Sequence, residues 1–479
     1  MFVLITLDGL TGQTVKGNDG TKFKINLYRF VREYIKKQSF KVGLVFDESD
    51  EITNPLAKRS KAVLSCFRKV KYKLLATGTT TRNNIAELYK QLELLYNNSV
   101  NMICDCEQIY SEVKNDGDVS IKEKVNKDFL NKPFPAYYGN NLFKACFNPS
   151  KATVFGIKKH NQDIYNKASL KHIIEKTILT RLFKEIAGPG KYEIKSHKLN
   201  QNPQEVKLYG KIIEELQIMI RRYFKQSGNE RKDRMMQLIQ QLQLLIKATS
   251  TPNHFKEYKE ALQPIFSEDL QKYPLFRVKG KSCSLPNKYE YIENMIRERS
   301  GCLVAVGCLT HESTLMYYNN LKMKFPGREI FLCLGTGTYG PRSKILKSFE
   351  ASETGILVAT QQSLKSSVNI PSCNEVIVEA LPWNVPKLLQ FCFRFIRYDS
   401  RDKSTIHMIT YKDTIDMNLF ALLLAKERIN DFVKTLEFKE ESDIYREFDV
   451  NLDLLDSILE KTKDHEGKVK IEWGMQKVS

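Results

Sequence analysis

The chain has 479 residues, of which 42% are hydrophobic and 27% are charged. This length and composition predict two or three globular domains with their own cores and exclude a disordered tail. Lys and Arg number 75 against 56 Asp and Glu, and the net charge of +19 favours a polyanionic partner, nucleic acid first, over a neutral small molecule. The sequence has no apolar run long enough to span a membrane and no signal peptide, so we expect an intracellular protein of the cytoplasm or nucleus, with no membrane contact.

Strand-like and helix-like windows alternate over the first hundred or so residues. Strands are expected at 3–6, 42–46 and 74–77, and the apolar spacing over 84–96 predicts a helix. Such alternation is typical of a parallel sheet covered by helices. We therefore assign residues 1–105 to a first α/β lobe.

The next segment, residues 106–280, is polar and rich in Lys, with helical patterns at 204–223 and 231–247. Between 121 and 280 the chain carries 30 Lys and Arg against 15 Asp and Glu, which accounts for 15 of the 19 net positive charges. We expect a basic helical insertion and linker over 106–280. Its charge makes it the predicted contact with nucleic acid.

The alternation of strands and helices resumes near residue 281. Apolar runs mark the expected strands, at 303–306, 330–334, 356–359, 376–378 and 406–409. This pattern predicts a second doubly wound α/β lobe over 281–440, followed by a C-terminal helix and tail over 441–479.

An acidic cluster follows the expected strand at 42–46. Asp47, Glu48 and Asp50 would lie at the carboxyl end of a parallel sheet, where doubly wound folds bind their ligands. In a nucleotide site Asp47 would hold Mg²⁺, and Glu48 would orient or deprotonate the attacking water. A solvated acidic turn is the alternative interpretation.

A second polar turn, Thr77, Gly78 and Thr79, follows the strand at 74–77. A glycine flanked by hydroxyl groups can bring the backbone close to a phosphate or to the first carboxylates, and Asn83 and Asn84 suit the cap of the following helix. The alternative is an ordinary turn from strand to helix. The spacing from the carboxylates makes the pair of motifs more specific than either one.

In the second lobe, Gln390, Arg394 and Arg397 stand at i, i+4 and i+7 among apolar residues, so a helix would carry all three on one face. Two guanidinium groups on so apolar a helix need an anionic partner. Structural salt bridges are one interpretation. The other is that both arginines reach the γ-phosphate of a nucleotide across a domain interface.

Taken in chain order, these segments resemble the motifs of Snf-type (switch/sucrose-nonfermenting) translocases of helicase superfamily two. DESD at 47–50 resembles the DEAH-type Walker B motif, LLATGTTTRNN at 74–84 the LTGTPxxNN motif, and QFCFRFIR at 390–397 the QAxxRxxR motif. The segment 356–386 is similar to a further motif at Asn369, Trp383 and Asn384. The likeness runs from near residue 1 to about 430.

The resemblance implies an α/β fold of two RecA-like parallel-sheet lobes, the first incomplete, with a helical insertion between them. It implies a DNA-dependent ATPase or translocase that uses ATP and Mg²⁺ and acts on nucleic acid, with double-stranded DNA favoured. Asp47 would hold Mg²⁺ through water, Glu48 would be the base, Gln390 would contact the nucleotide, and Arg394 and Arg397 would stabilise the γ-phosphate. Coupling to nucleic acid would fall to Thr77, Gly78, Thr79, Asn369 and Trp383.

The sequence also departs from the family pattern. Asp50 replaces a His, Lys365 and Ser367 replace paired glycines, and Asp399 and Ser400 replace a closing Gly-Gln. No GxxxxGK[ST] loop precedes Asp47, although such a loop holds the β and γ phosphates. We therefore expect the C-terminal part of a split or truncated enzyme, completed by a separate N-terminal polypeptide that carries the P-loop.

Two other functions stay open. One is a non-hydrolysing nucleic-acid-binding protein that retains the helicase scaffold, and the more remote one is a superfamily-two helicase that works on RNA. The abundance of Lys, Asn and Ile indicates an AT-rich genome, a clue to a virus or phage.

Overall fold

The structure is a computed structural model of the chain. The residues that it describes are 3–16, 21–25, 27–38, 41–81, 84–97, 106–115, 118–127, 129, 139–149, 163–188, 190–224, 242–252, 286–335, 339–364, 369–382, 385–397, 400, 402–417, 419–420, 423, 433–435, 460–463 and 469–472. Among the helices of these residues, none combines the length and the apolar character needed to cross a membrane.

The chain forms two compact units, each built from more than one segment. Unit 1 comprises Met1–Thr153, Ile157–Thr180 and Ala425–Lys439. Unit 2 comprises Val154–Gly156, Arg181–Leu424 and Glu440–Ser479.

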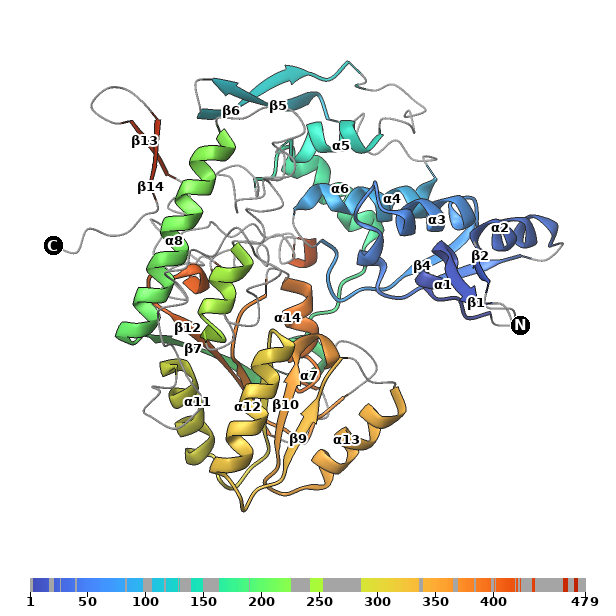
Figure 1. Ribbon diagram of the computed structural model, residues 1–479. Helices are drawn as coiled ribbons and strands as arrows, with labels where there is room; N and C mark the ends of the chain where they lie inside the picture. The colour runs from blue at the N-terminus through green and yellow to red at the C-terminus, as the bar shows by residue number, and fades with distance from the viewer. Residues whose placement is uncertain are drawn as a thin grey trace. The chain divides into compact units, whose positions relative to one another are not determined.

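Unit 1 combines helices with three separate pairs of strands (Figure 1). Its elements in chain order are α1 (Leu7–Thr11), β1 (Gln13–Lys16), β2 (Lys22–Ile25), α2 (Leu27–Lys37), β3 (Gly43–Phe46), η1 (Ser49–Ile52), α3 (Lys58–Phe67), β4 (Tyr72–Leu75), η2 (Ile85–Glu87), α4 (Leu88–Tyr96), β5 (Gln108–Asn115), β6 (Asp118–Val125), α5 (Gly139–Phe147) and α6 (Lys167–Thr177). The pairs β1–β2 and β5–β6 are antiparallel, whereas β3 and β4 are parallel, in the register Gly43↔Tyr72 to Phe46↔Leu75.

The β3–β4 pair has one covered face and one open face. Leu44, Phe46 and Leu75 pack against the core of α1 and α3. On the opposite face Val45 and Leu74 keep 74% and 61% of their surface exposed. Because parallel sheets are normally covered on both sides, this face is unusual for a sheet of this type.

The strand predicted at residues 3–6 is wrong. These residues have no strand partner among the described residues, and the Thr6 hydroxyl instead accepts the amide of Gly9 at 3.1 Å as the N-cap of α1. A capping hydroxyl satisfies an amide at the start of a helix, so the segment leads into α1 rather than into a sheet.

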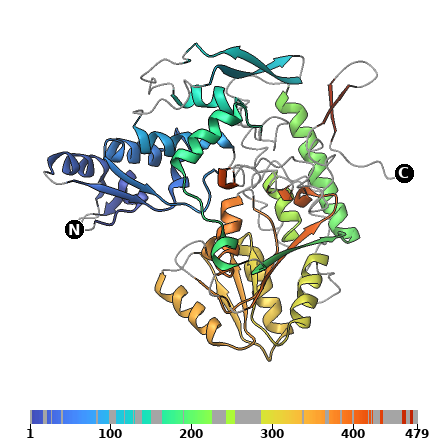
Figure 2. The same ribbon diagram turned by 180° about the vertical axis from the view of Figure 1, so that it is seen from behind.

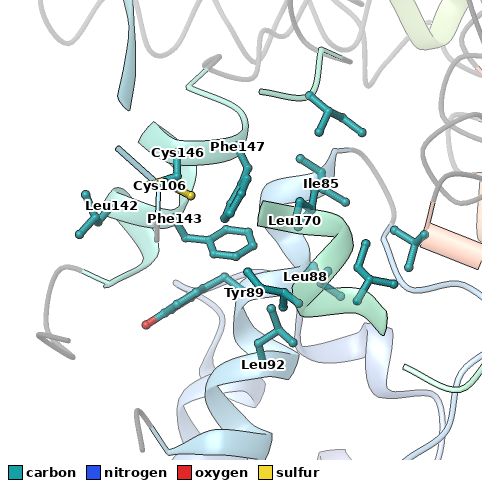
Figure 3. Packing of buried hydrophobic residues seen from close by; sticks show 14 residues of the cluster. Ile85, Leu88, Tyr89, Leu92, Cys106, Leu142, Phe143, Cys146, Phe147 and Leu170 are labelled. Carbon is teal, nitrogen blue, oxygen red and sulfur yellow. The ribbon is translucent and has the colours of Figure 1, made fainter. Parts of the chain in front are cut away.

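A second core of unit 1 lies among α4, α5 and α6 (Figure 3). Tyr89 packs on Phe143, with ring centroids 5.4 Å apart, and Phe143 packs on Phe147 at 4.6 Å. Cys106 and Cys146 belong to the same cluster and are buried free thiols. Burial of such apolar side chains holds the three helices together.

Unit 2 is built on a six-stranded parallel sheet in the order β7-β12-β11-β8-β10-β9. Its strands are β7 (Tyr192–Leu199), β8 (Val304–Cys308), β9 (Ile330–Cys333), β10 (Ile356–Thr360), β11 (Glu375–Val378) and β12 (Ser404–Tyr411). Its other described elements are α7 (Phe183–Ala187), α8 (Pro203–Phe224), α11 (Asn287–Glu298), α12 (His311–Lys324), α13 (Tyr339–Ala351), η5 (Gln361–Leu364), α14 (Val385–Cys392), β13 (Glu460–Lys463) and β14 (Val469–Glu472). This sheet confirms the predicted α/β class and the strands expected beyond residue 300.

Helices cover both faces of the sheet in unit 2. Apolar side chains of α11 and α12 pack on one face of β8 and β10. On the other face α14 approaches closely at Gly307, where a Cβ atom would lie 2.3 Å from the Phe391 ring. Glycine is therefore required at this position, because any larger residue would push α14 away from the sheet.

The structure divides the chain differently from the predicted ranges 1–105, 106–280, 281–440 and 441–479. Residues 192–199, expected in a helical insertion, form β7 at one edge of the unit 2 sheet, the green strand seen best in Figure 2. Residues 108–115 and 118–125 form the antiparallel strands β5 and β6 of unit 1. An edge strand tolerates the Lys-rich sequence of β7 because only one of its edges is paired, whereas strands inside a parallel sheet require apolar runs.

A buried ion pair joins the start of α11 to the segment after β12. Lys288 Nζ lies 2.8 Å from Asp416 Oδ2, and each side chain is only 1% exposed. Asp416 also accepts hydrogen bonds from the Thr249 hydroxyl at 2.8 Å and the Tyr411 amide at 3.0 Å. Glu379 is fully buried at the end of β11, and this burial raises its pKa to about 6 although the charge of Lys288 lowers it in part.

Lys288→Met should destabilise unit 2 strongly. The substitution removes the ammonium group and leaves the Asp416 carboxylate buried without its counter-ion, a loss that costs about 3–5 kcal/mol. Urea unfolding followed by circular dichroism would measure it. As a control, Lys322→Met changes an exposed lysine and should stay within about 0.5 kcal/mol of the wild type. Equal unfolding midpoints for the two variants would contradict the role of the ion pair.

Candidate functional site

The acidic motif of unit 1 begins directly after β3. Asp47 is exposed, and its Oδ1 accepts the amide of Glu48 at 3.0 Å. Glu48 has φ 52° and ψ 50°, a left-handed conformation that residues other than glycine rarely adopt. The Glu51 amide then donates to the Glu48 carbonyl at 3.0 Å and starts η1. The chain therefore turns sharply at Glu48 and leaves Asp47 at the carboxyl end of the strand.

The turn after β4 is hydrogen-bonded to this motif. The Ala76 amide donates to the Phe46 carbonyl at 2.8 Å, and the Ser49 amide donates to the Ala76 carbonyl at 3.0 Å. The Thr77 hydroxyl lies 3.1 Å from Asp50 Oδ1, to which it donates. Asp50 is fully buried, and the structure thus joins the two polar motifs that the sequence separates by about thirty residues.

The turn itself is ordered by the same hydroxyl group. The Thr79 amide donates to Thr77 Oγ1 at 3.1 Å, and Thr77 Oγ1 is 2.7 Å from the Thr79 carbonyl. Gly78 lies between them, and a Cβ atom added there would meet no atom within 4 Å. Gly78 therefore leaves open space at the tip of the turn, next to the carboxyl edge of the sheet.

Sequence reasoning missed Gln91, which fixes both motifs to α4. Its Oε1 accepts the Ser49 hydroxyl at 2.9 Å, and its Nε2 donates to the Thr80 carbonyl at 2.6 Å. Gln91 is only 5% exposed. A glutamine next to buried leucines on the apolar face of a predicted helix was the signal that could have revealed it.

Asp47 is an exposed carboxylate at this edge, and among the described residues no group of three or more His, Cys, Asp or Glu side chains could hold a metal ion. Magnesium prefers carboxylate and water oxygens and keeps several of its waters, so an exposed carboxylate suits it. Asp50 is buried and hydrogen-bonded to Thr77, which makes it a structural residue here.

In unit 2, β9 and β10 lie on one side of β8, whereas β11 and β12 lie on its other side. The crossover connections therefore change direction at β8, and the carboxyl ends of β8, β10 and β11 form a switch point. Such switch points are where α/β sheets bind ligands. Gln361 spans this point: its Nε2 donates to the carbonyls of Gly307 at 3.2 Å and Ala380 at 2.7 Å.

Asn369 and Arg394 belong to segments that touch in this unit. The Ile370 amide donates to the Arg394 carbonyl at 2.8 Å, so the loop that carries Asn369 is fixed to the segment after α14. Asn369 is exposed, whereas Gln390, Arg394 and Arg397 are half-buried. Trp383 and Asn384 lie outside the described residues.

The prediction that Gln390, Arg394 and Arg397 share one helical face is wrong. Helix α14 ends at Cys392, so only Gln390 lies on it. The Arg394 amide donates to the carbonyl of Phe391, three residues back, at 3.1 Å, which tightens the last turn and ends the regular helix. The rings of Phe391 and Phe395, buried 5.3 Å apart, hold the chain in this turn.

Two family models match the chain, one after the other. The SNF2-related domain matches residues 25–254, and the helicase conserved C-terminal domain matches residues 287–399. The curated proteins compared with the chain include none that matches it.

Solved structures of ATPase cores are also similar to the chain. The Sulfolobus solfataricus SWI2/SNF2 ATPase core in complex with dsDNA is 18% identical, with 88% of this chain and 75% of that chain covered and a TM-score of 0.36. The C-terminal part of the Fun30 ATPase domain is 15% identical, with 54% and 97% covered and a TM-score of 0.38. The Sulfolobus solfataricus SWI2/SNF2 ATPase C-terminal domain is 13% identical, with 56% and 98% covered and a TM-score of 0.34.

Thr77→Val should destabilise unit 1, because it removes the hydroxyl that donates to the Asp50 carboxylate while keeping the side-chain shape. Hydrogen bonds to charged groups contribute about 1.5–3 kcal/mol. Thr77→Ser keeps the hydroxyl and should lose less than about 1 kcal/mol. Chemical unfolding of both variants provides the comparison. If Val and Ser at position 77 gave the same stability, the bond to Asp50 would not hold the motifs together.

Proposed function

We propose that this chain, which belongs to the Snf-type helicase-like proteins of superfamily two, is a DNA-dependent ATPase that moves along nucleic acid. The observation that carries the proposal is the order of the two matching domains, SNF2-related at 25–254 and helicase C-terminal at 287–399. The parallel sheet of unit 2 and the parallel β3–β4 pair of unit 1 are consistent with RecA-like lobes.

In unit 1 the proposed chemistry belongs to the carboxyl edge of β3. Bound ATP with Mg²⁺ supplies the phosphoanhydride bond whose hydrolysis releases free energy for movement. Asp47 would hold the Mg²⁺ through water, because it is an exposed carboxylate at a strand end. Glu48 would accept the proton of the attacking water, and its left-handed backbone supports this role, since strained residues cluster at active sites.

In unit 2 the proposed nucleotide contacts are Gln390, Arg394 and Arg397. Guanidinium groups bind phosphate oxygens through paired N–H donors and retain their charge when partly buried. Both arginines are half-buried on a chain segment that buried phenylalanines hold in place. This restraint would limit the entropy lost on contact with the γ-phosphate.

Thr77, Gly78, Thr79, Asn369 and Trp383 are the proposed coupling residues. Thr77 donates to Asp50 in the acidic motif, and Asn369 precedes the residue whose amide donates to Arg394. Movement of nucleic acid at Asn369 would therefore reach Arg394 through one hydrogen bond, and movement at Thr77 would reach the acidic motif through Asp50.

The proposed partners are double-stranded DNA and a polypeptide that carries a GxxxxGK[ST] loop. The basic segment 121–280 supports the first, since its surplus of Lys and Arg can neutralise phosphates. The open face of β3 and β4, with Val45 and Leu74 exposed, supports the second, because a parallel sheet gains stability when its second face is covered. A non-hydrolysing nucleic-acid-binding protein is the alternative function.

Glu48→Gln should abolish ATP hydrolysis and preserve nucleotide binding, because it removes the base and keeps the shape. Arg397→Ala should slow turnover about 10³-fold or more. Phosphate release would be measured with and without DNA, for the chain alone and with a polypeptide of about 100–150 residues that carries the P-loop. We expect background turnover from the chain alone and DNA-stimulated turnover from the mixture.

The exposed carboxylate Glu353 provides a matched control, and Glu353→Gln should keep wild-type turnover. Turnover within tenfold of wild type in Glu48→Gln would refute the role of the base. Background turnover in every mixture, together with intact binding to DNA, would favour the alternative function.

Binding to duplex DNA should weaken steeply with salt and should not require ATP. The logarithm of the association constant should fall linearly with the logarithm of salt, with a slope of about 0.9 for each phosphate neutralised. Fluorescence anisotropy between about 50 and 200 mM salt would give this slope. An affinity that does not change over this range would show that the positive charge only solubilises the protein.

A further inference from the structure

We propose that unit 1 carries a second nucleic-acid site, for single-stranded nucleic acid, at the amino-terminal edge of β3 and β4. A pocket of about 750 Å³ lies there, between the ends of α2 and α3 and the residues that lead into the two strands. Of its 14 lining residues, seven are Lys or Arg and none is Asp or Glu. Such a concentration of one charge attracts an anion.

The pocket lies at the opposite edge of the sheet from the acidic motif. Lys41 precedes β3 and Asp47 follows it, and the parallel register places Gly43 beside Tyr72 at the amino-terminal edge. Six residues of extended chain span roughly 20 Å. A ligand in this pocket is therefore distinct from a nucleotide at Asp47.

Some of the positive charge has a structural explanation. Arg32 and Lys36 pair with Glu33 on the same helix, and Arg68 pairs with Glu93. Cations in the last turn of a helix also stabilise its free carbonyl groups.

Four lysines are not explained in this way: Lys41, Lys61, Lys69 and Lys71. All four are exposed, and among the described residues none of them forms an ion pair with a carboxylate. Like charges gathered in one concave surface repel one another, and an anion bound in the pocket would relieve this repulsion.

An aromatic ring lies close to two of these lysines. Lys71 Nζ and Lys41 Nζ are 5.7 and 6.0 Å from the centroid of the Tyr72 ring, which is 47% exposed. Sites for single-stranded nucleic acid combine cations for the backbone with aromatic rings on which bases stack. A free phosphate or an acidic peptide would use the lysines alone, whereas a nucleotide strand would use the ring as well.

The test measures binding of the full chain to a fluorescein-labelled oligothymidylate of about 20 nucleotides, longer than common site sizes. Lys69→Glu with Lys71→Glu should weaken binding at least about tenfold and reduce the salt slope by about 1.4, since each phosphate contact of a single strand contributes about 0.7. Tyr72→Leu should weaken binding about 5–100-fold, the effect of one lost stacking contact, with an unchanged salt slope.

The control is Lys322→Glu with Lys324→Glu, two exposed lysines of α12 in unit 2, one of which also lies over a tyrosine ring. It changes the net charge equally and should keep wild-type affinity. Circular dichroism would verify that all variants are folded. Equal losses in the two double variants, or none in the pocket variants, would overturn the proposal.

A loss in the lysine variant without a loss in Tyr72→Leu would also overturn it and would favour a free phosphate or an acidic peptide as ligand. Duplex binding and phosphate release, measured in parallel, test the proposed function separately, because the pocket contains none of the residues assigned to ATP. Loss of single-strand affinity with retained duplex binding would confirm that the two sites are independent.

Discussion

Parallel pairing of strands is the constraint on which both proposed nucleotide-binding edges depend. Hydrogen bonds between β3 and β4 fix Phe46 beside Leu75, so the residues that follow the two strands emerge at the same edge. Asp47 and Thr77 lie close together for this reason. In unit 2 parallel pairing likewise places the carboxyl ends of β8, β10 and β11 at one edge of the sheet. Gln361 donates to the carbonyls of Gly307 in β8 and Ala380 after β11, and so links these two ends.

A buried hydrogen bond then fixes the two polar motifs of unit 1 to each other. Asp50 occupies a position where the resembled family has His, and it accepts the Thr77 hydroxyl inside the protein. A carboxylate there accepts a hydrogen bond from the turn, whereas a neutral imidazole can both donate and accept. In this chain the acidic motif therefore contacts the turn after β4 through a carboxylate that accepts the hydrogen bond.

Unit 1 exposes two kinds of surface that a stable domain normally avoids. The open face of β3 and β4 presents Val45 and Leu74 to solvent, and the amino-terminal edge carries four lysines, Lys41, Lys61, Lys69 and Lys71, that form no ion pair with a carboxylate among the described residues. Each costs free energy in isolation, the first through exposed apolar area and the second through repulsion of like charges. These two surfaces are the ones to which we assign the proposed polypeptide and the proposed single-stranded nucleic acid.

Local patterns determined much of the fold. Apolar runs bounded by turn residues revealed the strands of unit 2, because strands buried on both faces are predominantly apolar. The spacing of the acidic motif and the Thr77 turn likewise placed both after strands. The family resemblance could also be read from the sequence, since it depends on the order of short motifs.

Tertiary structure decided the rest. The recruitment of β7 into the sheet of unit 2 depends on pairing with β12, about 210 residues later, which a window of sequence does not reveal. Helix α14 ends at Cys392, where the amides of Arg394 and Phe395 bond to carbonyls three residues back, although the i, i+4, i+7 spacing favoured a longer helix. The lysine pocket combines residues from two helices and two strand starts. The physical reason is common to all three: pairing and burial between distant segments outweigh local preference.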